Sequence, residues 1–271
     1  MAISGFIKKA FKVNPGKKMF GAVLDKASLR SIRICICGGG PLAPSVFRKY
    51  NQLGIDFVQG YGLTETSPIL TLNPTEAYRV TSVGKLIPQV EMKILEPDHD
   101  GRGEIAVKGP MVMTGYYKNK EATDAVFTKD GWFLTGDVGY LDADKYLYLT
   151  GRAKNVIVTE GGKNVYPEEI ENNFQLYSEV EQILVKGYII DKREKSEGIE
   201  ACIYPSKEWF EQEASKHGVT IRDSDIEARI KHIVDEVNAK MLPYQRISKV
   251  TVLKDALEMT TTKKIKRHIV K

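Results

Sequence analysis

The chain has 271 residues, of which 42% are hydrophobic and 28% charged, enough for one large globular domain or two modest ones. Its net charge of +5 is small and spread along the chain, which favours acidic small ligands such as phosphates over nucleic acid. No apolar run approaches the roughly 20 residues that a membrane-spanning helix needs. Cys35, Cys37 and Cys202 lie in apolar runs, so we interpret them as reduced core residues of a cytoplasmic protein.

Residues 1–80 predict part of a parallel-sheet α/β domain. In chain order they predict a basic helical segment, the strand "SIRICICGGG", the helix "APSVFRKYNQLG" and the strand "IDFVQG". Strand–helix–strand order is typical of a parallel sheet. It places the turns Gly38–Gly40 and Gly60–Ser67 at the carboxyl ends of two strands, where open α/β sheets bind their ligands.

Two further parts follow along the chain. Short strand patterns separated by turns, with the one helix "NKEATDAVF", predict a small β-barrel-like subdomain over residues 81–151. Residues 152–271 predict a separate small α+β domain. Its helices are "YPEEIENNF", which begins at a proline, and "DSDIEARIKHIVDEVNAKM", which has one apolar face. The expected class is therefore α/β with a small α+β C-terminal domain.

Four stretches carry candidate chemistry, namely "GYGLTET", "TGD", "GRAKNVIVTEGGKNVYPEEIE" and "TTTKKIKR". In the first, Tyr61 offers a flat face to a purine, Thr64 and Thr66 offer hydroxyl donors to phosphate, and Glu65 is a hard oxygen ligand suited to Mg²⁺. In the second, Asp137 can accept both hydroxyls of a ribose. Taken singly, the first stretch is also consistent with a tight polar turn, Asp137 with a turn-forming cap, the Gly-Gly stretch with a hairpin turn, and the last stretch with a solvated basic tail.

Together and in this order, the four stretches resemble those of the adenylate-forming ligases, and they look most like long-chain fatty-acid–CoA ligases. The resemblance extends from about Gly38 to the C-terminus. It implies an adenylate-forming ligase fold that lacks its N-terminal part. It also implies ATP-dependent activation of a fatty acid as acyl-AMP, followed by transfer to coenzyme A, with ATP or AMP, Mg²⁺ and coenzyme A as ligands.

The resemblance also implies roles for individual residues. In the family the residue matching Tyr61 packs on adenine, Thr64 contacts phosphate, Glu65 binds magnesium, and Asp137 with Arg152 binds the ribose. The remaining implied nucleotide-binding residues are Gly38, Gly39, Gly40, Gln59, Gly60 and Gly62, with Gly40 standing where the family usually has alanine.

Three implied roles fall in the last part of the chain. Lys264 corresponds to the catalytic lysine, although the sequence leaves the register between Lys263 and Lys264 open. Lys154 corresponds to the hinge about which the small domain rotates between the two half-reactions. Gly162 corresponds to a glycine that lines the tunnel for the pantetheine arm of coenzyme A.

One family motif has no counterpart in these residues. The hydroxyl-rich loop ending in Pro-Lys-Gly, which grips the β- and γ-phosphates, is not found, and "NPGKK" resembles only its tail. We therefore expect a fragment that needs the N-terminal portion of the same ligase and has little activity alone. Two alternatives stay open: a non-catalytic nucleotide-binding or assembly module, and an acyl-acyl-carrier-protein synthetase. The lysine-rich tail also leaves open contact with a membrane surface.

Overall fold

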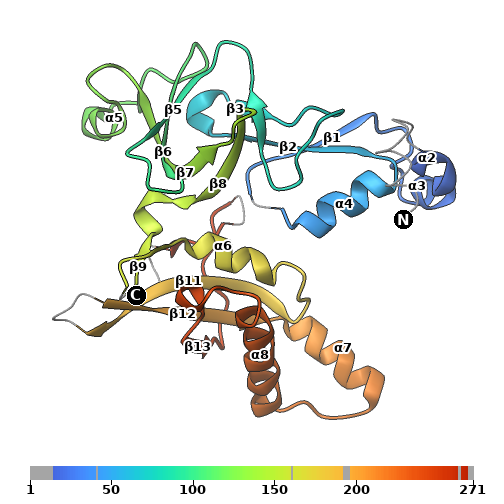
Figure 1. Cartoon of the computed structure of the whole chain (residues 1–271). Helices are drawn as coiled ribbons and strands as arrows, with labels where there is room; N and C mark the ends of the chain where they lie inside the picture. The colour runs from blue at the N-terminus through green and yellow to red at the C-terminus, as the bar shows by residue number, and fades with distance from the viewer. Residues whose placement is uncertain (1–14, 41, 160, 192–195, 262–263, 268–271) are drawn as a thin grey trace. The chain divides into compact units, whose positions relative to one another are not determined.

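The computed structural model describes residues 15–40, 42–159, 161–191, 196–261 and 264–267. The chain divides into two compact units, residues 1–153 and 154–271 (Figure 1). The boundary falls inside a short 3₁₀ turn, η2 (Ala153–Asn155). Each unit has its own hydrophobic core, so we describe each one by itself. The predicted division of the first unit at residue 81 stays a prediction.

An eight-stranded sheet forms the frame of the first unit, with strand order β1-β2-β3-β4-β8-β7-β6-β5. The strands are β1 (Ile34–Cys37), β2 (Asp56–Gly62), β3 (Ile69–Leu72), β4 (Gly84–Leu86), β5 (Glu91–Leu95), β6 (Gly103–Lys108), β7 (Phe133–Leu141) and β8 (Tyr146–Arg152). β1 pairs with β2 in parallel, and the other neighbours pair antiparallel. The predicted α/β class is confirmed, and hydrogen bonds join the parallel and antiparallel strands into one sheet.

The helices of the first unit are α2 (Gly16–Met19), α3 (Gly21–Lys26), α4 (Pro44–Gln52) and α5 (Lys120–Val126). α4 begins at a proline, whose fixed φ suits the first helical turn. Phe47 on α4 is fully buried and meets the ring of Phe57 on β2 edge to face at 5.8 Å. Nδ2 of Asn51 donates to the carbonyl of Phe57 at 2.9 Å. α4 is thereby tied to β2, and β2 runs straight into the "GYGLTET" turn.

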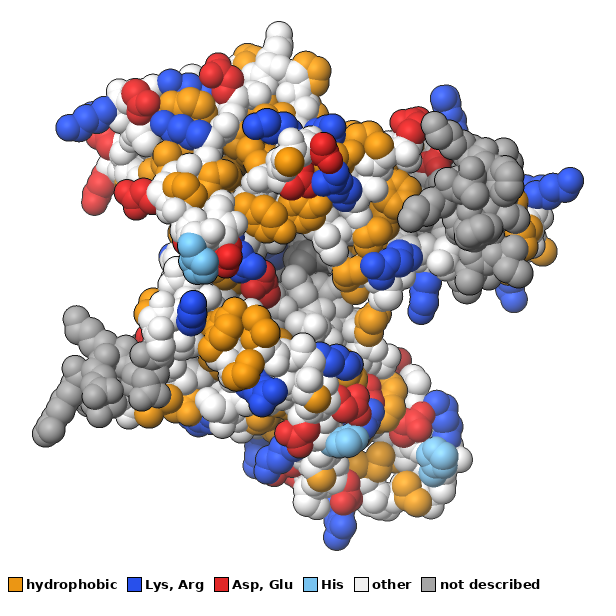
Figure 2. All heavy atoms as spheres, viewed as in Figure 1, with side chains coloured by type: hydrophobic (Ala, Val, Ile, Leu, Met, Phe, Trp, Pro, Cys, Tyr) orange, Lys and Arg blue, Asp and Glu red, His pale blue; other side chains and the backbone are white. Residues whose placement is uncertain are grey.

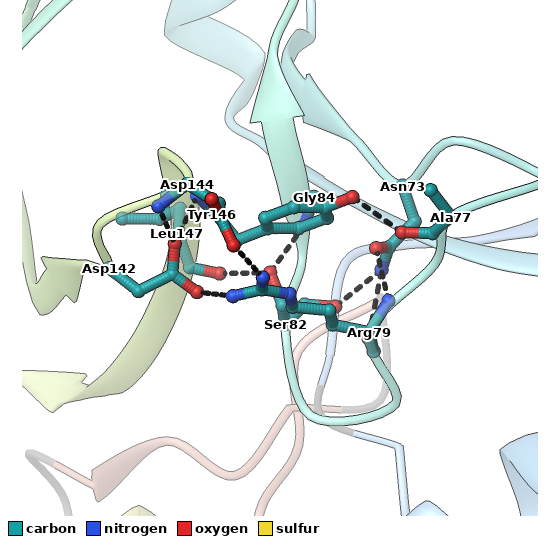
Figure 3. A network of polar contacts seen from close by, with 9 residues as sticks. All are labelled: Asn73, Ala77, Arg79, Ser82, Gly84, Asp142, Asp144, Tyr146 and Leu147. Atoms are coloured by element: carbon teal, nitrogen blue, oxygen red, sulfur yellow. Dashed lines mark hydrogen bonds and ion pairs between the residues drawn. The ribbon is translucent and has the colours of Figure 1, made fainter.

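A polar network anchors the loop between β3 and β4 to the turn between β7 and β8 (Figure 3). The Arg79 guanidinium pairs with the carboxylates of Asp142 and Asp144, and the Tyr146 hydroxyl donates to the carbonyl of Ala77 at 2.5 Å. The Arg79 guanidinium also lies 4.3 Å from the centre of the Tyr146 ring, a cation–π distance. This network fixes the start of β8, the strand that ends in Arg152.

The second unit has a three-stranded sheet, β11-β12-β13, and a two-stranded sheet, β10-β9. Its elements are β9 (Ile157–Val158), β10 (Asn164–Val165), α6 (Pro167–Glu171), β11 (Val180–Asp191), β12 (Ser196–Pro205), α7 (Lys207–His217), α8 (Asp223–Asn238) and β13 (Lys249–Val252). β12 pairs antiparallel with β11 and parallel with β13. The buried face of α8 consists of Ile230, Ile233, Val234 and Val237, which confirms the predicted apolar face.

Surface and cysteine features agree with an ordinary globular chain. On the face shown in Figure 2, basic and acidic side chains are interspersed over the described residues. Within those residues no helix is long and apolar enough to cross a membrane. Cys202 is buried, Cys35 and Cys37 are half-buried, and all three are free thiols, as predicted.

Replacement of Ile233 by alanine tests the core of the second unit. Because Ile233 is fully buried, the Ile233→Ala substitution should lower the free energy of unfolding by about 2–5 kcal/mol. Urea unfolding followed by circular dichroism measures this loss. The control, Val219→Ala, alters a side chain that is 56% exposed and should change stability little. Equal effects of the two substitutions would contradict the core assignment.

Candidate active site

The "GYGLTET" turn forms where β2 leaves the sheet. A Cβ on Gly62 would lie 1.8 Å from the carbonyl oxygen of Pro68, so this close return of the chain requires glycine. Thr66 is fully buried; its Oγ1 accepts from the Leu63 amide at 3.0 Å and donates to Pro68 O at 2.5 Å. The Thr66 hydroxyl therefore builds the turn, contrary to our reading of it as a phosphate donor. Thr64 is exposed and Glu65 half-exposed.

Residues from three of the four predicted stretches meet at the carboxylate of Asp137. The Tyr61 hydroxyl donates to Oδ2 of Asp137 at 2.7 Å, and the Arg152 guanidinium donates to Oδ1 at 2.7 Å. The Asp137 side chain is 14% exposed. Arg152 stands opposite Asp137 in the register of β7 and β8. Sequence reasoning placed Tyr61, Asp137 and Arg152 at one ligand but did not foresee these direct contacts.

Tyr61 is held as a hydrogen-bond donor. Burial, with the nearby negative charge of Asp137 as the next cause, raises the pKa of Tyr61 far above its ordinary value. The side chain is 8% exposed and belongs to the core of the first unit. Its predicted stacking on adenine stays a prediction, and the ring has little free face in this arrangement.

A pocket of about 360 Å³ opens beside these groups. It is lined by Leu63, Glu65, Glu104, Tyr116, Ala125, Val126, Phe133, Leu134, Thr135, Gly136 and Arg152. Sequence reasoning missed Glu104 and Tyr116. The Tyr116 hydroxyl donates to Oε1 of Glu65 at 3.1 Å, and Oε1 of Glu104 accepts from the Gly136 amide at 3.2 Å. Neither residue belongs to one of the four stretches, and no spacing rule connects them to Glu65 or Gly136.

The Gly38–Gly40 turn after β1 lies beside the end of β2. The turn predicted to begin at Gly60 begins later, because Gly60–Gly62 continue β2 and pair with β3. In the parallel register Cys37 stands opposite Gln59, and a Cβ on Gly38 would come within 3.5 Å of the carbonyl oxygen of Gly60. A Cβ on Gly39 or Gly40 would meet nothing within 4 Å. The backbone at Gly39 and Gly40 therefore has open space beside it, which a ligand could occupy. Gln59 is buried, and its carbonyl accepts from the Asn73 amide at 2.9 Å.

These groups fit the ligands that the sequence implied. Each oxygen of Asp137 accepts one protein hydrogen bond and keeps capacity for another, as a ribose diol would require. Glu65 supplies one accessible carboxylate, and Mg²⁺ in nucleotide sites is usually held by one or two carboxylates together with phosphate oxygens. Arg152 and the exposed Thr64 add donors for anionic groups. The first unit could therefore hold a nucleotide and its metal.

The second unit carries the other three predicted residues. Lys154 is exposed in η2 at the start of this unit. Gly162 has φ of +68° in the turn between β9 and β10, where its amide donates to the Thr159 carbonyl at 2.8 Å. Lys264 is exposed and lies in a small hairpin, in which the Thr260 amide donates to the Lys264 carbonyl at 2.8 Å. Lys263 lies outside the described residues.

A half-buried ion pair anchors that hairpin. Arg267 donates to both oxygens of Glu171, at 2.6 and 2.5 Å, and to the carbonyl of Val185 at 2.9 Å. The Val185 amide donates back to Oε1 of Glu171 at 2.7 Å. Burial raises the pKa of Glu171 to about 7, although Arg267 opposes this shift. The chain three residues after Lys264 is therefore tied to α6 and β11.

Comparison with known proteins places these features in a family. A profile described as "AMP-binding enzyme" matches residues 5–117. Long-chain-fatty-acid–CoA ligase FadD15 of Mycobacterium bovis is 32% identical over 270 residues, covering 92% of this chain and 43% of the relative. The 2-succinylbenzoate–CoA ligase of Listeria monocytogenes is 42% identical over 164 residues, covering 60% and 34%. Feruloyl-CoA synthase of Amycolatopsis is 39% identical over 168 residues, covering 59% and 34%.

Solved structures of similar fold are also acyl-CoA synthetases. The o-succinylbenzoate CoA synthetase of Bacillus subtilis with its acyl-adenylate intermediate has a TM-score of 0.73 and 28% identity, over 94% of this chain and 49% of that one. The same enzyme with ATP and magnesium has a TM-score of 0.71 and 28% identity, over 93% and 49%. The fold is thus that of the adenylate-forming ligases. The chain is related to the AMP-binding enzyme family and spans about half the length, or less, of these relatives.

The Glu171–Arg267 pair predicts a pH dependence of stability. The pKa of Glu171 is raised to about 7 in the folded state, above that of a glutamate in the unfolded chain. Between these two pKa values the folded chain keeps a proton on Glu171 that the unfolded chain has released. The free energy of unfolding should therefore fall as pH rises from about 5 to about 8, by up to about 3 kcal/mol.

The Glu171→Gln variant mimics the protonated acid and tests this dependence. It should match the wild type near pH 5 and be the more stable of the two near pH 8, by urea unfolding across this range. Glu227→Gln, on the exposed face of α8, is the matched control and should follow the wild type. A Glu171→Gln profile parallel to the wild type would contradict the raised pKa.

Proposed function

We propose that this chain supplies the nucleotide site and the mobile lysine domain of an ATP-dependent, AMP-forming acid–CoA ligase. The enzyme would join a carboxylic acid to AMP with release of pyrophosphate, and then transfer the acyl group to the thiol of coenzyme A. One observation carries the proposal: Tyr61 and Arg152 converge on the carboxylate of Asp137, beside a pocket that contains Glu65.

In the first unit the proposed roles follow from the contacts. Asp137 accepts the ribose hydroxyls, and Tyr61 and Arg152 hold its carboxylate in place. Thr64 donates to a phosphate oxygen, and Glu65 binds the metal. The metal, when bound, neutralises phosphate charge and draws electrons from the reacting phosphorus. The glycine turn at Gly38–Gly40 lets the backbone approach the nucleotide, and Gly60–Gly62 form the end of β2 that leads to Thr64 and Glu65.

In the second unit we propose that Lys264 offsets the negative charge that develops when the carboxylate attacks the α-phosphate. Its hairpin is tied to the unit through Arg267, so Lys264 would move with the unit as one body. Lys154 lies at the boundary between the units, where a hinge absorbs backbone rotation. Gly162 would lie along the pantetheine arm. The working division is residues 1–80, 81–151 and 152–271.

The substrate proposed first is a long-chain fatty acid. The long-chain ligase of Mycobacterium bovis aligns with 92% of this chain. The second candidate is an aromatic acid, because the succinylbenzoate ligase is more identical, at 42%, over a shorter 164 residues. An acyl-carrier protein as acceptor, and a non-catalytic nucleotide-binding module, are the remaining alternatives. We place the protein in the cytoplasm, with the lysine-rich tail available to a membrane surface.

Ribose recognition by Asp137 gives the first test. We expect the purified chain to bind AMP more tightly than 2′,3′-dideoxy-AMP, and Asp137→Asn to abolish this preference. The loss should be about 10- to 100-fold in AMP affinity, since a hydrogen bond to a charged acceptor contributes about 1.5–3 kcal/mol. Calorimetric titration measures both ligands.

Asp124→Asn is the control, because Asp124 is an exposed residue of α5 paired with Lys120. It should leave both affinities unchanged. Circular dichroism shows whether Asp137→Asn keeps the fold, since the substitution also alters the Arg152 contact. An unchanged preference for AMP in folded Asp137→Asn would remove Asp137 from the nucleotide site.

ATP–pyrophosphate exchange with a panel of acids gives the second test. The chain should show no exchange alone, because the hydroxyl-rich phosphate loop is not among its residues. Exchange should appear when a separately made N-terminal part of a relative is added, and the preferred acid would then name the substrate class. Exchange by the chain alone would contradict the dependence on a further part. No exchange with either preparation would favour the non-catalytic module.

A further inference from the structure

We propose that Tyr116 is a positioning residue for Glu65, and that its hydroxyl strengthens the binding of a divalent cation at the nucleotide site. This inference rests on the proposed function, because it assigns a partner to the carboxylate that would hold the metal.

Glu65 is held by the loop around Tyr116 at two points. The Tyr116 hydroxyl donates to Oε1 of Glu65 at 3.1 Å, and the Met113 amide donates to the main-chain carbonyl of Glu65 at 2.8 Å. The side chains of Glu65 and Tyr116 both line the pocket of about 360 Å³. Within the part of the chain that the structure describes, Tyr116 is the one side chain that hydrogen-bonds the Glu65 carboxylate.

The loop that presents Tyr116 is itself anchored. The Tyr116 amide donates to Oγ1 of Thr123 on α5 at 2.9 Å. Oγ1 of Thr123 donates in turn to the Asn119 carbonyl at 2.8 Å. Oδ1 of Asn119 caps the helix by accepting from the Ala122 amide at 3.0 Å. A capped helix thus sets the position of the Tyr116 hydroxyl.

The chemistry of this contact suits a metal ligand. One oxygen of Glu65 accepts the phenol, which leaves Oε2 for a cation and limits rotation of the carboxylate. A tyrosine hydroxyl carries its proton at neutral pH, so it acts as a hydrogen-bond donor to the Glu65 carboxylate. Outer hydrogen bonds of this kind orient metal ligands, and their loss typically lowers metal affinity by about 10- to 100-fold.

A purely structural role makes a different prediction. If Tyr116 only completes the pocket wall, removal of its hydroxyl should affect nucleotide binding equally with and without metal. If Tyr116 positions Glu65, removal should reduce only the gain in affinity that the metal brings. The neighbouring Tyr117 is 87% exposed and contacts Lys118 through its ring, 5.2 Å from Nζ, so it offers a matched control.

The experiment is a calorimetric titration of ATP into the purified chain, with Mg²⁺ and with EDTA, for the wild type, Tyr116→Phe and Tyr117→Phe. We expect Mg²⁺ to tighten ATP binding in the wild type and in Tyr117→Phe. In Tyr116→Phe this gain should fall by about tenfold, while the affinity in EDTA and the melting temperature stay at wild-type values.

Three results would overturn the inference. An unchanged Mg²⁺ gain in Tyr116→Phe, or equal losses with and without Mg²⁺, would show that Tyr116 does not position the metal ligand, and the proposed nucleotide site would stand. A wild-type chain that binds no ATP in either buffer would instead overturn the proposed nucleotide site, and this inference with it.

Discussion

The pair of hydrogen bonds that Asp137 accepts from Tyr61 and Arg152 is the interaction on which the first unit's site depends. A carboxylate that is mostly buried is costly unless charged or polar partners compensate for lost water. The compensation comes from two other strands, β2 and β8. The three strands are therefore held in one relative position, and the pocket with Glu65 lies beside them. The polar network at Arg79 supports the same arrangement from the other end of β8.

The second unit solves a similar problem at its C-terminal segment. Polar contacts hold the short hairpin that carries Lys264. Arg267, at its end, donates to the half-buried Glu171 and to the main chain of β11. The energetic cost of burying Glu171 is expressed in its raised pKa, which makes the attachment sensitive to pH near neutrality. The Lys264 side chain is therefore exposed, while the main chain three residues later is held by Arg267.

Glu65 contrasts with both of these carboxylates. Asp137 and Glu171 have an arginine and a second donor each, whereas Glu65 is half-exposed and has the Tyr116 hydroxyl. An incompletely compensated carboxylate facing a pocket is well suited to an exchangeable cation, because its remaining capacity is free for the ligand. This difference in partners, rather than residue type, distinguishes Glu65, which we propose holds the cation, from Asp137, proposed to accept the ribose hydroxyls, and from Glu171, which anchors the C-terminal hairpin.

The sequence alone determined the class of fold, the parallel pairing of β1 and β2, the apolar face of α8, and the family. These features follow from local periodicity and from short motifs whose residues are neighbours in the chain. Only the tertiary structure decided that Thr66 serves the turn, that Tyr61 donates to Asp137 across 76 residues, and that Tyr116 and Glu104 line the pocket. Such contacts depend on how distant strands and loops pack. The spacing of residues along the chain does not predict these contacts. A carboxylate accepts hydrogen bonds from whichever donors the fold brings near it, and those donors are distant in the sequence.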